Sequence, residues 1–326
     1  MMISLLRSSL KPYSLALLPM LVLLSSSALL PAQTTSSHLS MLHERIRNEV
    51  TALNALDTAK ASTVQAAYSW ATLGSDYAAA AEFSNAENAF NHALQLLRHD
   101  DSARPFYAAV LEKFGYLYLT FGHFDEALNL RRAALTVREQ IGSPIEIARG
   151  RSHLAEVLLA THHYKQAEFE ADAAYQAMRQ HDDPEKADLV SALVVRAYAR
   201  CGHHNCDQGL IDAQEAEAMS RASFQPDSLS MGAALAALGY AQQHSGAIAD
   251  AEETSQRALV ILKELLAPGD PRLIHALVQY HDCLEAQHKK PEAREIDNQL
   301  SVMYRQSRQS CLNCSISAFG MRSTAP

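Results

Sequence analysis

Apolar and small residues recur along the chain at helical spacing, in paired segments separated by short polar turns. The clearest pair occupies residues 68–94. One helical face of its first half carries Trp70, Leu73, Gly74 and Tyr77, and one face of its second half carries Phe83, Ala86, Phe90 and Ala93. Residues three or four apart lie on the same side of a helix. The pattern therefore predicts two helices packed against each other through a tight turn.

This pattern returns five times at a nearly constant period. A small residue opens each expected second helix at positions 86, 127, 167, 209, 251 and 293. A proline stands just before most first helices, where its missing N–H costs nothing: Pro105, Pro144, Pro184, Pro226 and Pro271. Asp183 and Asp270 are expected to cap two of these helices. We predict an all-α solenoid of six helix-turn-helix repeats over residues 63–305.

The fourth repeat departs from the others in this reading. Val194, Val195 and Tyr198 match the apolar positions of its first helix, and Gly209 opens its second. That alignment implies about two extra residues in the intervening turn.

The W-x-x-L-G-x-x-Y and F-x-x-A-x-x-x-F-x-x-A spacings of residues 70–93 resemble the tetratricopeptide repeat. The period resembles the variety of about 42 residues found in kinesin light chains and many exported bacterial proteins. The resemblance covers roughly three quarters of the chain. It implies a right-handed superhelix whose first helices line a concave groove, which receives a peptide or helix of another protein.

Seven residues are the candidate partner-binding set of that groove: Tyr116, Arg149, Glu156, Arg196, Arg200, Tyr240 and Gln243. Arg196 and Arg200 lie one helical turn apart, and Arg149 lies on a neighbouring first helix. Guanidinium groups in that arrangement pair well with carboxylates, so the partner is expected to be a protein or peptide, possibly an acidic one. The alternative is that these arginines are solvated or pair with local acids such as Glu156. Some relatives bind chaperone C-termini through a Lys and Asn set that this sequence lacks.

The first 33 residues have the layout of a secretory signal peptide. Arg7 and Lys11 precede the apolar run Leu15–Leu24, and small residues lead to an expected cleavage near Ala32/Gln33 or after residue 28. The predicted location is therefore periplasmic or secreted. The alternative is an uncleaved anchor, which would make the chain a membrane-tethered accessory domain.

Two further segments flank the repeats. Residues 34–62 are predicted to hold a capping helix from about Ser40 to Ala55, with apolar residues at helical spacing, since a solenoid needs its end faces covered. Residues 306–326 read as a tail with a short strand-like run, Ile316–Met321, and a C-x-x-C motif.

Composition narrows the function. The formal net charge is −8, which disfavours nucleic acid because phosphates need a basic face. No segment after the leader is apolar enough to span a membrane. Hydrolase, zinc-protease, phosphate-loop and dinucleotide motifs are missing from the sequence, so we expect neither catalysis nor a cofactor.

Five cysteines remain to be assigned. Cys201 and Cys206 flank the Gly-His-His-Asn turn of the fourth repeat, where a disulfide is expected in an exported protein and a zinc site is the alternative. Cys311 and Cys314 are expected to form a local disulfide or to stay free in the tail. Cys283 reads as a small buried apolar residue.

Histidines fall at or beside most intra-repeat turns: His123, His162, His163, His203, His204, His244 and His288. Stacked repeats would align these turns along one edge. A metal- or redox-responsive module built on this edge and on the Cys201–Cys206 turn is the alternative function, against the simpler interpretation of exposed polar turns.

Overall fold

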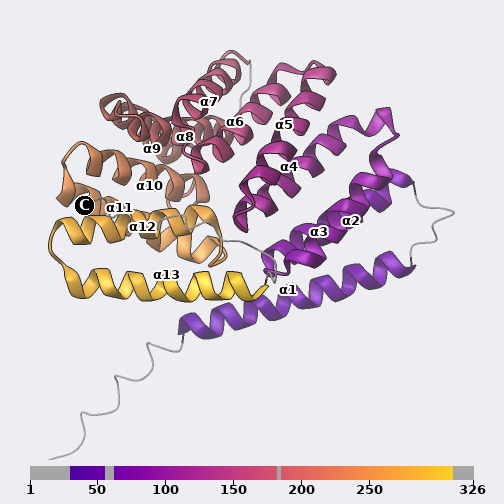
Figure 1. Cartoon of the computed structure of the whole chain (residues 1–326), viewed down its shortest axis with the longest axis horizontal. Coiled ribbons are helices and arrows are strands. Elements are labelled where there is room, and N and C mark those ends of the chain that lie inside the picture. Colours follow the sequence, from indigo (N-terminus) through magenta and orange to yellow (C-terminus); the bar gives the residue numbers. More distant parts are fainter. Residues whose placement is uncertain (1–29, 56–61, 182–184, 311–326) are drawn as a thin grey trace, which may run out of the picture. The chain divides into compact units, whose positions relative to one another are not determined.

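The computed structural model describes residues 30–55, 62–181 and 185–310, in which all regular structure is helical (Figure 1). The chain divides into two units, residues 1–44 and 45–326, which are described separately. The described part of the first unit is the beginning of helix α1 (Leu30–Ala55), which starts about ten residues before the predicted capping helix. Most of the predicted leader, residues 1–29, lies outside the described residues.

The second unit contains six helix pairs, which confirm the predicted all-α solenoid. The pairs are α2 (Thr63–Ala79) with α3 (Phe83–Leu97), α4 (Arg104–Thr120) with α5 (Phe124–Ile141), α6 (Pro144–Ala160) with α7 (Tyr164–Arg179), α8 (Lys186–Gly202) with α9 (Cys206–Ser223), α10 (Leu229–His244) with α11 (Ile248–Leu265), and α12 (Pro271–Ala286) with α13 (Lys290–Ser310). A short 3-10 helix, Asp101–Ala103, precedes α4. None of the helices in the described ranges is long and apolar enough to cross a membrane.

All six intra-repeat turns have the same length and the same backbone shape. Each spans three residues, and the middle one has a left-handed conformation with φ between 59° and 85°: Ala81, Gly122, His162, His204, Gly246 and His288. The following N–H closes the helix by donating to a carbonyl five residues earlier, as from Glu82 to Tyr77 at 2.8 Å. The repeat therefore keeps one rigid turn throughout.

The fourth repeat follows this rule, so the expected two-residue insertion in its turn is wrong. Its turn is residues 203–205, the same length as the others. Counting back from the left-handed His204 puts Ala197 at the small position of the first helix, and Arg196 and Arg200 at positions that Leu73 and Tyr77 hold in the first repeat. The sequence-based alignment is shifted by two residues because it matched the apolar pair Val194–Val195 to the apolar positions of the other first helices.

Within each repeat, one position of the first helix meets one position of the second helix, and in the first five repeats the residue of the first helix is Gly or Ala. A Cβ at Gly74 would lie 3.0 Å from the Phe90 ring, and one at Gly239 would overlap the Ser255 hydroxyl. The other four pairs are Gly115 with Arg131, Ala155 with Ala171, Ala197 with Ala213, and His281 with Asp297. In the first five repeats the two helices thus approach closely at a Gly or Ala of the first helix.

First helices begin largely as their prolines and caps predict. Pro105, Pro144 and Pro271 lie in the first turns of their helices, and the Asp270 carboxylate accepts a hydrogen bond from the Arg272 N–H at 2.9 Å. Pro226 lies in the loop before α10, and residues 183 and 184 are outside the described ranges.

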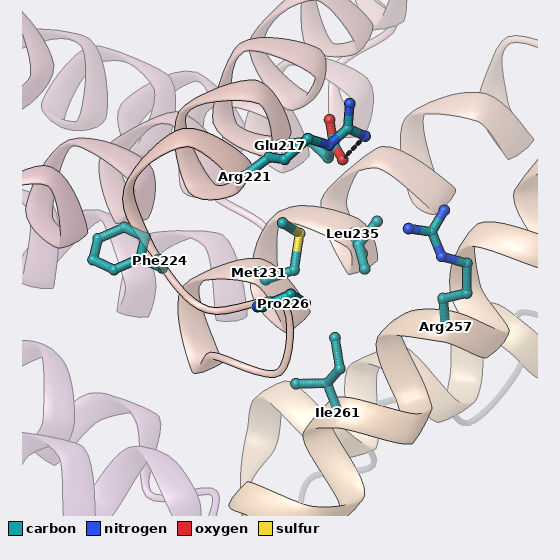
Figure 2. Close-up of a pocket in the computed structure, with 8 residues that line it drawn as sticks. All are labelled: Glu217, Arg221, Phe224, Pro226, Met231, Leu235, Arg257 and Ile261. Atoms are coloured by element: carbon teal, nitrogen blue, oxygen red, sulfur yellow. Dashed lines mark hydrogen bonds and ion pairs between the residues drawn. The ribbon is translucent and has the colours of Figure 1, made fainter.

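Loops between repeats gather at the edge opposite the three-residue turns. One of them, residues 224–228 between α9 and α10, borders a pocket of about 400 Å³ together with residues of α9, α10 and α11 (Figure 2). The part of α1 that belongs to the second unit contacts the first repeat, where the Arg45 guanidinium holds both carboxylate oxygens of Asp76 on α2. The capping role of this helix stays a prediction.

Candidate binding surface

One position of each first helix, directly after the small residue, is defined here as the inner position: Ser75, Tyr116, Glu156, Tyr198, Tyr240 and Asp282. Its side chains meet across non-adjacent repeats. The Tyr198 ring of α8 lies 4.8 Å from the His275 ring of α12, two repeats further on. First helices two repeats apart approach in this way on the concave side of a curved array. The inner position therefore marks the concave face.

Four rings from three first helices form what we call the inner aromatic cluster: Tyr198, Tyr240, His244 and His275. Ring centroids are 5.1 Å apart for Tyr198 and Tyr240, and 4.1 Å apart for Tyr240 and His244. Gln279 adds an amide, with its Nε2 atom 3.0 Å from Nδ1 of His275. The predicted residue Tyr240 lies at the centre of the cluster, and Gln243 lies next to His244 on the same helix.

The third repeat, through the turn between α6 and α7, contributes the rim of this cluster. The Nδ1 atom of His162 lies 2.6 Å from the Tyr164 hydroxyl, and the Tyr164 ring packs so closely on Gly202 that a Cβ there would overlap it. His162 and His244 are exposed, whereas Tyr198 is only 8% exposed. The cluster is thus buried at one end and open to solvent at the other.

Burial keeps three members of the inner aromatic cluster, Tyr198, Tyr240 and His275, uncharged near neutral pH. It lowers the pKa of His275 to about 4, helped by the nearby imidazoles of His162 and His244. Burial also raises the pKa of Tyr240 to about 12 and raises the pKa of Tyr198 further. A surface of aromatic rings and hydroxyl groups suits apolar and hydrogen-bonding side chains rather than a strongly charged ligand.

The concave face is bridged by a contact between two distant repeats. The Tyr116 hydroxyl of α4 donates a 2.8 Å hydrogen bond to Asp270, which precedes α12. The Arg272 guanidinium holds the same carboxylate and lies 5.7 Å from the Tyr116 ring centroid. The second and sixth repeats therefore touch, because the curvature of the array brings their inner faces together.

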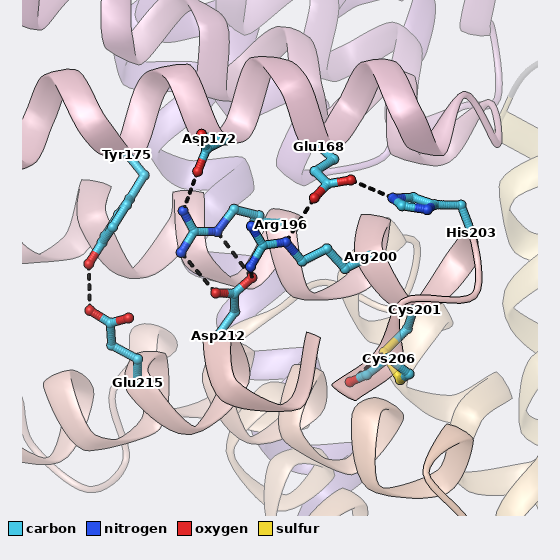
Figure 3. Close-up of polar contacts among 10 residues, drawn as sticks. All are labelled: Glu168, Asp172, Tyr175, Arg196, Arg200, Cys201, His203, Cys206, Asp212 and Glu215. Atoms are coloured by element: carbon cyan, nitrogen blue, oxygen red, sulfur yellow. Dashed lines mark hydrogen bonds and ion pairs between the residues drawn. A yellow bond between two sulfur atoms is a disulfide. The ribbon is translucent and has the colours of Figure 1, made fainter. Parts of the chain in front are cut away.

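Arg196 and Arg200 lie between helices, as their corrected register requires (Figure 3). Arg196 is 5% exposed and donates to Asp212 of α9 at 2.8 and 3.0 Å and to Asp172 of α7 at 2.6 Å. Arg200 donates to the same Asp212 at 2.7 Å and to Glu168 of α7 at 2.9 Å. Both guanidinium groups thus join three helices.

The other charged candidates are also engaged by neighbouring side chains. Arg149 contacts the carboxylates of Glu146 at 2.7 Å, Glu185 at 2.8 Å and Asp188 at 2.6 Å. Glu156 lies 3.5 Å from the buried Arg131 guanidinium. The expectation of an acidic partner rested on these arginines, and their charges are already balanced within the chain.

The structure also shows the state of three of the five cysteines. A disulfide joins Cys201 to Cys206 across the fourth turn, and a Cβ at Gly209 would lie 2.7 Å from the Cys201 sulfur. Cys283 is a buried thiol whose pKa burial raises to about 11. Cys311 and Cys314 lie outside the described residues. Across residues 30–55, 62–181 and 185–310, no three His, Cys, Asp or Glu side chains gather to hold a metal ion.

Three of the seven turn histidines have a backbone explanation. His162, His204 and His288 occupy the left-handed position that Gly122 and Gly246 fill in other repeats. Histidine is enriched among residues that adopt this conformation.

Tyr198 was missed by sequence reasoning, which counted it among the apolar positions of the first helix of the fourth repeat. Counting strictly from Tyr116 to Glu156 and then to Tyr240 would have found Tyr198 at the same position of the fourth repeat.

No protein-family model matches the sequence, and no curated protein matches it. Solved structures do match the fold. The apo form of RapI superposes with a TM-score of 0.65 at 14% sequence identity, covering 82% of this chain and 93% of RapI.

Two further solved structures share this arrangement. A Rap protein complexed with Competence and Sporulation Factor has a TM-score of 0.57 at 14% identity, covering 88% of this chain and 89% of its own. A tetratricopeptide repeat protein from Parabacteroides merdae ATCC 43184 has a TM-score of 0.53 at 14% identity, covering 83% and 98%. At this identity the likeness establishes the fold.

Proposed function

From the premise that the chain has the tetratricopeptide-repeat fold, we propose that it is a non-catalytic scaffold that binds a peptide or helical segment of another protein. The binding surface is the open side of the inner aromatic cluster. A similar fold in the Rap protein was solved with Competence and Sporulation Factor, which supports a ligand-holding role for such an array. Fold alone does not assign function, so the proposal rests on the cluster itself.

The observation that carries the proposal is the partly exposed set of rings from several repeats. Tyr240 is half-buried, and His162 and His244 are exposed beside it. Such rings offer large contact areas with few rotatable bonds, which is why Tyr is favoured in protein interfaces. Because the charges of Arg149, Arg196 and Arg200 are balanced internally, the ligand segment is expected to be mainly apolar and aromatic rather than acidic.

Site-specific photo-crosslinking in the native host tests this surface. Tyr240 is replaced by benzoylphenylalanine, which keeps an aromatic ring at that position, and the crosslinked species are identified by mass spectrometry. The matched control places the same residue at Ile211, which is 53% exposed on α9.

We expect a discrete crosslinked protein or peptide from position 240 that position 211 does not give. It should disappear when His244→Ala is added. Identical products from both positions, or none from position 240, would contradict binding at the inner aromatic cluster.

Export is the second part of the proposal. It is supported by the layout of residues 1–33 and is compatible with the Cys201–Cys206 disulfide, which persists in oxidising compartments. The intact mass of the protein from its host distinguishes the alternatives. A mature chain starting near residue 33 would support export with cleavage, whereas the full-length mass would favour the tethered alternative.

A further inference from the structure

The pocket at the loop between α9 and α10 lies away from the inner aromatic cluster and has a different chemistry. Its inner wall is apolar: Met231 and Leu235 of α10 are 6% and 2% exposed, and Phe224 and Ile261 are half-buried. A volume of about 400 Å³ lies within the usual range of small-ligand sites. The pocket can therefore take one apolar side chain together with the backbone that carries it.

Two arginines and one glutamate border this apolar wall (Figure 2). Arg221 pairs with Glu217 one turn earlier on α9, and Glu217 is only 8% exposed, so Arg221 serves as its internal counter-charge. Arg257 of α11 lies on the opposite side with its guanidinium directed toward the pocket, as Figure 2 shows. Arg257 is exposed, and no ion pair or hydrogen bond of its side chain is found within residues 30–55, 62–181 and 185–310. The pocket thus offers one net positive charge beside an apolar wall.

The loop that encloses the pocket is held in one shape. The Phe224 N–H donates to the Ser220 carbonyl at 3.0 Å, and the Ser228 hydroxyl caps α10 by accepting from the Met231 N–H at 3.2 Å. The Ser220 hydroxyl reaches the Ser230 carbonyl at 3.3 Å, which ties α9 to α10. A site formed in advance loses less entropy on binding than one that must be ordered by its ligand.

We infer that this pocket binds the carboxyl terminus of a polypeptide whose last residue is apolar. The terminal side chain enters between Met231, Leu235 and Ile261, and the terminal carboxylate pairs with Arg257. An apolar group and a single carboxylate on the same residue match the one net charge and the apolar wall, and a C-terminal residue is the part of a polypeptide that carries both. This site is separate from the inner aromatic cluster, so either surface can fail its test while the other passes.

Fluorescence anisotropy with the purified full chain tests the inference. The probe is a labelled hexapeptide, Gly-Ser-Gly-Ser-Gly-Leu, with a free carboxylate. It is compared with the same peptide as a C-terminal amide and with one that ends in Gly instead of Leu. We expect the amide and the Gly-ended peptide to bind about tenfold more weakly or worse, because each lacks one of the two matching groups.

Variants of the chain assign the binding to this pocket. Arg257→Ala should weaken the leucine-ended acid about tenfold, and Ile261→Glu should weaken it further by repelling the carboxylate. Arg132→Ala removes one exposed arginine from α5, outside the pocket, and should leave the affinity unchanged. Circular dichroism checks that each variant keeps its helices.

Several results would overturn the inference. One is equal affinity for the peptide with a free carboxylate and the peptide amide. Another is that the Arg257→Ala variant binds the leucine-ended peptide as tightly as the parent protein does. The third is no binding of the leucine-ended peptide up to about 1 mM. The affinity of octanoate, an apolar acid that is not part of a polypeptide, is measured in the same assay by competition. If octanoate binds more tightly than the peptide, the site recognises free apolar acids instead of a polypeptide terminus.

Discussion

The six intra-repeat turns make the same conformational demand on different residues. Gly122 and Gly246 meet it without cost, whereas Ala81 and three histidines adopt φ between 59° and 71°. An L-residue with a side chain is strained in this region by about 1 kcal/mol, which the rest of the repeat must offset.

Ala81→Gly should therefore stabilise the protein. Ala81 is exposed, so the substitution loses little packing, and relief of the left-handed strain should add about 0.5–1 kcal/mol despite the more flexible unfolded chain. Urea denaturation followed by circular dichroism measures the change. The neighbouring Ala80 has a φ of −80°, so Ala80→Gly should be neutral or destabilising. Equal effects of the two substitutions would contradict the argument.

For single residues, the sequence predicts which positions lie in turns, but it does not predict which side chains surround a given residue. The turn histidines stand out as a row, yet nothing local separates a metal ligand from a residue that tolerates a left-handed backbone. Arg196 and Arg200 look like surface charges because Asp212, which neutralises both, lies on the next helix. Pairing between helices is a tertiary property.

The two helices of a repeat approach closely at one shared pair of positions. The residues at this pair differ between repeats: Gly74 faces the large Phe90 ring, Gly239 faces Ser255, and Ala197 faces Ala213. The same backbone approach thus accepts several pairs, provided that the two side chains together fill the space.

The double substitution Gly239→Ala with Ser255→Ala should restore what Gly239→Ala alone loses. The single change overlaps the Ser255 hydroxyl and should cost about 1–3 kcal/mol. Removing that hydroxyl recreates the Ala–Ala pair of the third and fourth repeats. Unfolding free energies of the two single variants and the double variant form the cycle that measures the coupling. Strict additivity would show that the two positions do not share space.

The element scale is where sequence reasoning succeeds most. The helix bounds can be predicted from the spacing of apolar residues, from prolines near the helix starts and from capping residues, because each of these signals lies within or next to the helix itself. The exception is the fourth repeat, where two adjacent valines shifted the alignment, although the three-residue turn at residues 203–205 fixes it.

Over the whole second unit, the repeats form a bridged array rather than a simple line. In a linear solenoid each repeat contacts only its neighbours, so its ends fray independently. Here Tyr116 and Asp270 join the second repeat to the sixth. The sequence could not predict this closure, because it depends on small rotations that accumulate over several repeats.

Tyr116→Phe tests the bridge with minimal change of shape. Asp270 keeps its partner Arg272, so the loss should be only about 1 kcal/mol. Hydrogen exchange should nevertheless speed up in α4 and α12 together, because both ends of the bridge are released. Faster exchange in α4 alone would mean that the contact does not couple the two repeats. Exchange in the central helix α8 serves as the internal control.

Acid should destabilise the array through His275. Its pKa is about 4 in the fold against an ordinary 6.5, so the unfolded chain binds a proton that the fold excludes. The stability contributed by neutral His275 is complete above pH 6.5 and is lost as the pH falls toward 4, by on the order of 2 kcal/mol at pH 5. Urea midpoints at pH 7 and pH 5 measure this loss.

His275→Gln should flatten that pH dependence, since glutamine does not titrate and can still approach Gln279. His288→Gln, at an exposed turn residue, should keep the slope of the parent. Parallel slopes in all three proteins would exclude His275 as the responsible group.

The uniform three-residue turns also indicate where the chain can accept extra residues. The loops at the other edge vary, from residues 142–143 to the longer 98–103 and 224–228, while every intra-repeat turn keeps its size. Differences in connection length between the repeats are thus confined to one side of the array. A designer who wishes to graft a foreign segment into this protein has one edge that already accepts variation and one that should be left untouched.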